Sequence, residues 1–270
     1  MKTSELVTYL DGFLNAAAFH DASLNGLQVA GRPETFSLAV ACTASQNAIE
    51  AAVNDGCDTL LVHHGLIWRG QQGAYAGSLK ERLQTIFDAD LNLIAYHLPL
   101  DANMQLGNNK RLIEIAGAVN PRYLVSGDPT SIAMKADFDE AICAGELATR
   151  LASGLDCRVR LICAPKEQKL KRLAVCSGAG SFMLDDCAEP DFDALITGEC
   201  SEMTWHLANE RGIAVFVTGH DASECPGIAA LGEHLADRFN LELLTVLENP
   251  EQCDDFYDAE GLMEAESLDE

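Results

Sequence analysis

The feature that most constrains the fold is the alternation of short apolar runs with stretches of helical periodicity. An apolar run followed by a helix-length segment and a second apolar run is typical of α/β proteins with a substantially parallel sheet. The chain has 270 residues, of which 48% are apolar, so it can form one large domain or two of ordinary size. We therefore predict a folded α/β protein.

The expected elements follow from these two kinds of pattern. Apolar runs predict strands at residues 37–42, 59–63, 92–97, 132–138, 158–163, 172–176, 194–197, 213–218 and 241–247. Helical spacing predicts helices at residues 45–55, 79–89, 139–152, 201–211 and 226–239. Ser45 and Ser78 are the expected N-caps of the first two helices, because a serine hydroxyl can accept a hydrogen bond from a free amide there.

A boundary between two subdomains is expected at residues 119–130, where Pro121, Gly127 and Pro129 interrupt regular structure. This divides the chain into a first α/β subdomain at 1–125, a second at 126–247 and a tail at 248–270. No low-complexity linker separates the halves, so we expect them to pack closely.

Charge is concentrated in the tail. The chain carries 42 acidic and 18 basic residues, and ten of the acidic residues lie in 248–270, which has no basic residue. We expect this tail to be disordered, with no catalytic role, because its few apolar residues cannot offset the entropy of ordering. A net charge of −24 also argues against a nucleic acid polymer as partner, since a negative surface repels phosphates.

The sequence also predicts a cytoplasmic location. No apolar window reaches the length of about 18 residues that a spanning helix requires, and Lys2, Glu5 and Asp11 interrupt the amino-terminal segment, so we expect neither membrane insertion nor secretion. The ten cysteines form no C-x-x-C pair and most lie in apolar runs, which indicates reduced core residues.

Two segments of the chain resemble each other at a constant offset of 156 residues. Residues 40–64 and 196–220 align Ser45 with Ser201 and His64 with His220, and both read strand, turn, helix, strand and histidine. Any two βαβ units share this order, so duplication and coincidence both remain open. A true duplication would deliver histidines from two equivalent units to one centre.

Four of the seven histidines follow apolar strands, where ligands bind in open α/β sheets: His63, His64, His97 and His220. Asp101 and Glu224 each come four residues after one of these histidines. Pro99 predicts that Asp101 lies on a loop, and Pro226 predicts that a helix begins near Glu224.

This combination of side chains predicts a metal site. Imidazole and carboxylate ligands suit a first-row divalent ion such as zinc, manganese, iron or nickel. Four histidines and two carboxylates exceed the needs of one tetrahedral ion, so we expect two ions bridged by a carboxylate and a water. The remaining histidines lack this context and are expected to be surface or helix residues: His20, His206 and His234. Asp221 is expected to point outward.

Six motifs give the chain a family resemblance: Asn25-Gly26-Leu27-Gln28-Val29, Thr43-Ala44-Ser45, His63-His64-Gly65, His97-Leu98-Pro99-Leu100-Asp101, Thr197-Gly198-Glu199 and Gly219-His220-Asp221-Ala222-Ser223-Glu224. Their order and spacing resemble the GTP cyclohydrolase I type 2-like family, also called the NGG-one-interacting-factor-three-like or YbgI-like family. The resemblance covers residues 1–247 and is to the short bacterial form.

The resemblance implies two related α/β subdomains with mixed, largely parallel sheets packed around a dinuclear metal site, and assembly into a toroidal homohexamer. Carried over residue by residue, it implies five metal ligands: His63, His64, Asp101, His220 and Glu224, with Glu224 as the bridge. His97 and Glu199 also match family motifs. His97 is either a ligand or a residue that orients one, and Glu199 is either functional or a helix-start carboxylate.

The activity that the resemblance implies is metal-dependent hydrolysis of GTP or a related nucleotide, damaged nucleotides included, by a metal-bound hydroxide. We expect His97 or Glu199 to carry the proton. Arg69, Lys110 and Arg111 are candidates to offset the negative charge near a nucleotide, and residues 177–181 form either an anion-binding loop or an ordinary turn.

Two readings of a different class stay open. One is a non-catalytic metal protein that stores or delivers ions, or a ring that serves as a scaffold. The other is a regulatory interaction protein that acts through its acidic tail.

Overall fold

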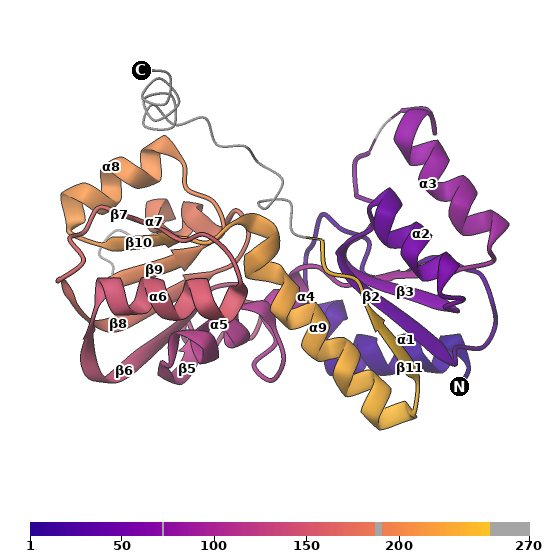
Figure 1. The fold of residues 1–270 in the computed structure, drawn as a ribbon, viewed down its shortest axis with the longest axis horizontal. Coiled ribbons are helices and arrows are strands. Elements are labelled where there is room, and N and C mark those ends of the chain that lie inside the picture. Colours follow the sequence, from indigo (N-terminus) through magenta and orange to yellow (C-terminus); the bar gives the residue numbers. More distant parts are fainter. Residues whose placement is uncertain (72, 187–190, 249–270) are drawn as a thin grey trace, which may run out of the picture.

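The computed structural model describes residues 1–71, 73–186 and 191–248 and places them in two lobes, each built on one β-sheet (Figure 1). The first sheet has the strand order β1-β4-β3-β2-β11, and three of its four neighbouring pairs are parallel. Its strands are β1 (Gly26–Val29), β2 (Ser37–Thr43), β3 (Thr59–His64), β4 (Asn92–Ala95) and β11 (Glu242–Thr245). Its helices are α1 (Thr3–Phe13), α2 (Gln46–Asn54) and α3 (Gly77–Asp88), and a short 3₁₀ turn, η1, covers Ala16–Ala18.

The second sheet has the order β5-β6-β8-β9-β10-β7, and two of its five neighbouring pairs are parallel. Its strands are β5 (Val119–Tyr123), β6 (Met134–Cys143), β7 (Arg160–Ile162), β8 (Lys169–Cys176), β9 (Ala194–Thr197) and β10 (Ala214–Val217). Helices α5 (Asn108–Ala116), α6 (Ala144–Leu155), α7 (Met183–Asp186) and α8 (Glu202–Arg211) belong to this lobe, as does the 3₁₀ turn η2 (Gly180–Phe182). The mixed α/β class is confirmed, and antiparallel neighbours predominate in this second sheet.

Two elements connect the lobes. The short helix α4 (Leu98–Asp101) and the long helix α9 (His220–Phe239) lie at the junction, and α9 runs from the end of β10 back to the first sheet (Figure 1). There β11 pairs in parallel with β2. The sheets therefore do not follow the expected division at residue 126, because β5 joins the second sheet and β11 joins the first.

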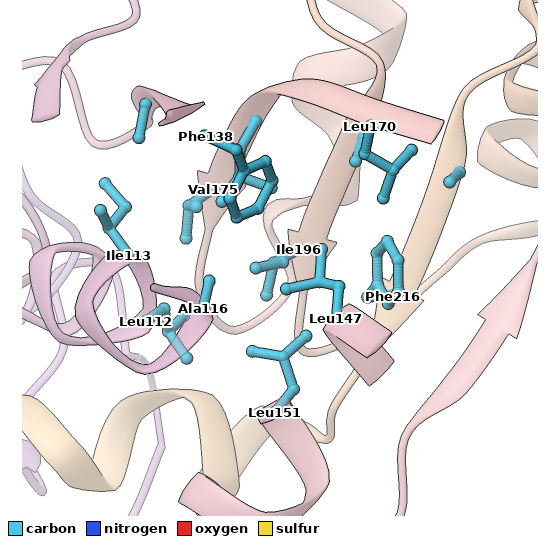
Figure 2. Close-up of a cluster of buried hydrophobic side chains, with 14 of the residues drawn as sticks. Leu112, Ile113, Ala116, Phe138, Leu147, Leu151, Leu170, Val175, Ile196 and Phe216 are labelled. Carbon is cyan, nitrogen blue, oxygen red and sulfur yellow. The ribbon is translucent and has the colours of Figure 1, made fainter. Parts of the chain in front are cut away.

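Each sheet is packed on both faces, which agrees with the continuous apolar runs of its central strands. In β2, Leu38 and Val40 face α1 and α9, whereas Ala39 and Ala41 face α2 and α3. In the second lobe, α5 and α6 cover one face of the sheet around the buried Phe216. Figure 2 shows this cluster, with side chains from both helices and from the strands: Leu112, Ile113, Ala116, Phe138, Leu147, Leu151, Leu170, Val175, Ile196 and Phe216.

The predicted N-cap at Ser45 is confirmed, since its hydroxyl accepts a hydrogen bond from the Ala48 amide at 2.9 Å. The predicted N-cap at Ser78 is wrong, because α3 begins at Gly77 after Ala76. The helix expected at residues 139–152 begins at Ala144 instead. Backbone pairing with β8 extends β6 through Cys143 and overrides the local helical pattern.

The helix expected to begin at Pro226 begins six residues earlier, at His220. Pro226 therefore lies inside α9, where it has no N–H to donate to the helix. The following amide, of Gly227, donates to Asn108 Oδ1 at 3.0 Å. The helix continues beyond this point because Ile228, Leu231 and Leu235 are packed in the core.

Three further observations concern membrane-spanning helices, the cysteines and the acidic tail. Within the residues that the structure describes, no helix is both long enough and apolar enough to cross a membrane. Cys42, Cys57 and Cys176 are free thiols and are buried. The acidic tail, apart from Glu248, lies outside the described residues; the Glu248 carboxylate accepts a hydrogen bond from the Ser45 hydroxyl at 2.6 Å.

The carboxylate of Asp58 joins the start of β3 to the segment before β2. It accepts hydrogen bonds from Arg32 Nη1 at 2.8 Å and from the Phe36 and Ser37 amides at 2.8 and 3.0 Å. Burial alone would raise the pKa of Asp58, but the hydrogen bonds from Arg32 and the two amides lower it below its usual value. The ionised form is therefore the one that stabilises the fold.

We expect Asp58→Asn to lower the free energy of unfolding by about 1–3 kcal/mol at pH 7, because two partly buried amides lose a charged acceptor. Since the folded-state pKa is depressed, this stabilisation is present above the unfolded pKa near 4 and is lost as pH falls through the folded value. Urea unfolding at pH 7 and below pH 4 measures both effects. The exposed Asp139→Asn is the control, and an equal loss in both variants would contradict the assignment.

Candidate metal centre

The candidate ligands come from both lobes and meet at their junction. β3 ends in His63 and His64, α4 ends in Asp101, and α9 begins at His220 (Figure 1). Asp101 lies on a one-turn helix rather than on the loop predicted from Pro99, because proline is accepted in the first turn of a helix. The junction thus collects the histidine and carboxylate side chains that the sequence singled out.

Glu224 lies at the centre of the group. It follows His220 by four residues on α9, so both side chains lie on one face of the helix. Its carboxylate is 3.6 Å from His63 Nε2, 3.1 Å from His64 Nε2 and 3.2 Å from His220 Nε2. Only 3% of Glu224 is exposed, so these imidazoles form most of its polar surroundings.

His63 is held with one ring nitrogen directed at the centre. Its Nδ1 lies 3.0 Å from the Tyr96 carbonyl oxygen, and donation to that acceptor leaves Nε2 as the nitrogen that can bind a metal ion once the ring has lost its second proton. His63 is fully buried, and its Nε2 has no hydrogen-bond partner. Glu224 Oε2 is also buried and has no hydrogen-bond partner, although the rings of His64 and His220 are close to it. Buried lone pairs left in this way fit a bound cation.

Asp101 is directed into the centre by two neighbours. Its Oδ1 accepts hydrogen bonds from Asn108 Nδ2 at 2.8 Å and from Ser177 Oγ at 2.9 Å. Its Oδ2 is left facing His63 Nε2, at 3.7 Å. Asn108 Oδ1 also accepts a hydrogen bond from the Gly227 amide, so α9 helps to hold Asn108, and through it Asp101, in place.

Two other imidazoles are oriented through Nδ1. His64 Nδ1 lies 3.1 Å from Thr43 Oγ1, and His220 Nδ1 lies 2.6 Å from Glu199 Oε1. Such contacts set which nitrogen faces a metal and raise its basicity. Glu199, a candidate proton carrier, is therefore placed where it positions His220.

His97 is oriented by Asp21, a residue that the sequence analysis did not identify. His97 Nδ1 lies 2.8 Å from Asp21 Oδ1, while Asp21 also accepts bonds from Asn25 Nδ2 and the Leu98 amide. Burial alone would raise the pKa of Asp21, but the hydrogen bonds with His97 and Asn25 lower it to about 2. Asn25 belongs to a quoted motif and marks this region, but no local pattern marks Asp21.

We expect Asp21→Asn to weaken metal binding by about 10- to 100-fold, the usual effect of removing a carboxylate that orients a histidine. The reason is that the amide of asparagine does not carry the charge that holds His97 with Nε2 toward the centre. Competition with a metallochromic chelator measures the dissociation constant. Asp237→Asn, on the exposed side of α9, is the control, and thermal unfolding of the metal-free proteins separates binding from folding. Unchanged affinity would remove Asp21 from the site.

Close approach of neighbouring atoms explains two glycines near the candidate centre, Gly65 and Gly178. Gln28 Oε1 accepts the Leu66 and Ile67 amides, and a Cβ at Gly65 would lie 2.3 Å from that oxygen. Gly178 has a φ of +58°, and a Cβ there would lie 2.2 Å from Glu224 Oε1. Residues 177–181, considered as an anion-binding loop, thus supply Ser177 to Asp101 and make room for Glu224.

The carboxylates at the centre favour the protonated forms of two histidines. Burial lowers the pKa of His63, but Asp101 and Glu224 together raise it to about 9. The contact with Glu224 raises the pKa of His220 to about 9 as well. Because metal ligands must be deprotonated, a metal ion entering this site displaces these protons.

Donor atoms from these residues form two overlapping triads. The donor atoms of His63, His64 and His97 lie within 4.8 Å of one another, and so do those of His63, Asp101 and Glu224. Three protein ligands with one open position is the usual arrangement of a catalytic zinc site. The two triads could hold a metal ion, and their nitrogen and oxygen donors suit first-row divalent ions.

The three histidines that do not follow a strand lie outside the candidate centre. His20 contacts Arg69, His206 lies 3.8 Å from Glu202, and His234 lies 2.6 Å from the Tyr9 hydroxyl. Asp221 does not point outward as expected. It is half-buried and accepts a hydrogen bond from Cys225 Sγ at 3.0 Å, because the first turn of α9 rotates it toward β2.

A cavity of about 180 Å³ opens at the centre. Apolar residues Leu98, Ile132 and Phe182 line it together with His97 and Glu224, and no lysine or arginine does so among the described residues. Three basic residues that were candidates to offset negative charge are engaged elsewhere: Lys110 and Arg111 pair with Glu114, and Arg69 contacts His20.

Comparison with known proteins agrees with this fold. Residues 1–251 match the family model Duf34/NIF3 (NGG1p interacting factor 3). A Yersinia pestis protein is 39% identical over 254 residues, covering 93% of this chain and all of the relative. A Pseudomonas aeruginosa protein is 37% identical over 243 residues, covering 90% of this chain and 96% of the relative. Both relatives are named GTP cyclohydrolase 1 type 2 homolog.

Solved structures give the same result. The protein ybgI, described as of unknown function, superposes with a TM-score of 0.86 at 34% identity and covers 93% of this chain and all of that one. A Thermus thermophilus protein superposes with a TM-score of 0.83 at 31% identity, covering 92% of this chain and 99% of that one. The chain is therefore a member of the Duf34/NIF3 family.

Proposed function

We propose that this protein is a two-metal hydrolase that acts on GTP or a related nucleotide, damaged nucleotides included. The observation that carries the proposal is the pair of overlapping triads, which share the fully buried His63 and leave its Nε2 unpartnered. In this proposal His63, His64, Asp101, His220 and Glu224 would hold the two ions, with Glu224 placed among the three imidazoles. The names of the curated relatives support the class of substrate.

Two bound ions would lower the pKa of a shared water toward neutrality and polarise the atom that is attacked. The chain's own residues would position the substrate and move protons. Because Asp21 occupies His97 Nδ1, Nε2 is the nitrogen that can bind an ion or exchange a proton with a substrate. Glu199 would act by holding His220, with which it makes a 2.6 Å contact.

The cavity favours partial rather than complete enclosure of a nucleotide. Its volume of about 180 Å³ is below the roughly 300–1,000 Å³ of sites that enclose small ligands, so one end of the substrate would enter. Since no basic side chain lines it within the described part of the chain, the phosphates would depend on the ions for neutralisation. We expect hydrolysis to require a divalent cation.

The test combines elemental analysis with a nucleotide screen. Purified protein is loaded with zinc, iron, manganese or nickel, and GTP, other triphosphates and oxidised nucleotides are followed by liquid chromatography and mass spectrometry. Ring-opened or dephosphorylated product that depends on the metal supports the proposal. Two tightly bound ions per chain without turnover of any nucleotide would instead indicate storage or delivery of metal.

We further propose a homohexamer in the cytoplasm, on the family resemblance of the motifs. Light scattering coupled to size-exclusion chromatography measures the number of chains per particle, and cell fractionation measures location. Particles of six chains in the soluble fraction would support both proposals. A monomer at micromolar concentration would contradict the first.

A further inference from the structure

A second cluster of metal-binding side chains lies beside the candidate centre. Cys42 is buried near the end of β2, while Asp221 and Cys225 lie one turn apart on α9, which packs against β2. Cys225 Sγ is 3.0 Å from Asp221 Oδ2. One donor atom from each of the three residues lies within 4.8 Å of the others.

The register of α9 explains why two clusters are adjacent. His220 and Glu224 are four residues apart and face the candidate centre, and Asp221 and Cys225 repeat that spacing one residue later. A shift of one residue rotates the second pair by about 100° around the helix, which directs it toward Cys42 on β2. The second pair is thus presented to a different partner strand by the same helix.

The donor set of this cluster differs from that of the candidate centre. The overlapping triads contain only nitrogen and oxygen donors, whereas this cluster has two sulfur atoms and one carboxylate. Two thiolates with one carboxylate suit zinc or a similarly thiophilic divalent ion.

We propose that Cys42, Asp221 and Cys225 form a further metal site, which binds one thiophilic divalent ion of the zinc class. The ion would tie α9 to β2 across the junction of the lobes. Both thiols are free in the structure, so no disulfide occupies these ligands. The site is separate from the proposed hydrolase chemistry, and its test does not depend on turnover.

X-ray absorption of the full-length, zinc-loaded protein tests the proposal, because sulfur ligands give a zinc–sulfur shell at about 2.3 Å that nitrogen and oxygen ligands do not. We expect this shell in wild type. In Cys225→Ser we expect the shell to be absent and the zinc content to fall by one ion per chain. Glu224→Gln should keep the sulfur shell while losing zinc bound through nitrogen and oxygen. Cys143→Ser, in the second lobe, is the matched control and should keep both.

Three results would overturn the proposal. The first is a wild-type spectrum without a sulfur shell. The second is a shell that survives Cys225→Ser but is lost in Cys42→Ser, which would assign Cys42 to the neighbouring centre, since its sulfur also lies within 4.8 Å of donor atoms of His64 and Glu224. The third is a disulfide between Cys42 and Cys225 in protein loaded with zinc under reducing conditions. If Cys225→Ser fails to fold, Asp221→Asn serves instead, with the same zinc ion lost.

Discussion

Glu224→Gln is expected to remove the two ions of the candidate centre while leaving the protein folded. Glutamine keeps the size of the side chain but lacks the charge that lies within 3.6 Å of His63, His64 and His220. A carboxylate is needed to hold two cations close together, and an amide presents N–H groups to them instead. We expect metal affinity to fall by more than about 100-fold, beyond the effect of losing a residue that only orients a ligand.

Elemental analysis after dialysis against the same metal buffer measures this loss directly. Glu233→Gln is the matched control, because it makes the same chemical change on an exposed position of the same helix. Added metal should raise the melting temperature of wild type and of Glu233→Gln by more than that of Glu224→Gln at the same metal concentration, because Glu224→Gln loses the ions of the candidate centre. Equal metal content in all three proteins would show that Glu224 is not the bridge.

Gly178→Ala is expected to weaken metal binding at the same centre, although Gly178 is not itself a proposed ligand. Gly178 has a φ of +58°, and its added Cβ would lie 2.2 Å from Glu224 Oε1 and 3.0 Å from His220 Nε2. The carboxylate therefore has to leave its place between the imidazoles. We expect metal affinity to fall by about 100-fold or more, because the displaced group is itself a proposed ligand.

Gly212→Ala separates displacement of the ligand from backbone strain. Gly212 has a φ of +67°, so alanine meets about the same strain of 1–2 kcal/mol in the left-handed region, but its Cβ would contact nothing within 4 Å. Chemical denaturation should show similar destabilisation of the two variants, and metal titration should show weak binding only in Gly178→Ala. Normal binding by Gly178→Ala would mean that Glu224 tolerates displacement and is not a ligand.

Local signals predicted the elements that depend on local interactions. The N-cap at Ser45 and the strands around β2 and β3 follow from side-chain capping and from apolar runs, which act over a few residues. The prediction failed where distant pairing decided the outcome. β6 continues through Cys143 because β8 provides a partner, and α9 passes through Pro226 because its far half is packed in the core.

The same distinction applies to the site. The candidate ligands could be selected from sequence, because histidines at strand ends followed by carboxylates four residues later are visible in one dimension. Their distant orienting partners were not visible, since Asp21 lies 76 residues from His97 and Ser177 lies 76 residues from Asp101. The inward position of Asp221 could not be predicted, because nothing in its own segment shows that Cys42 lies opposite it.

The sequence by itself determined the α/β class, the spacing of His220 and Glu224 on one helix face, and the identity of the donor side chains. Only the tertiary structure decided that α9 leaves the second sheet and returns to the first, where β11 pairs with β2. That return places Glu224 against His63 and His64 from the other lobe. Helix periodicity relates neighbours in the chain, whereas burial of apolar faces and strand pairing bring distant segments together, so the site becomes complete only when both lobes have packed.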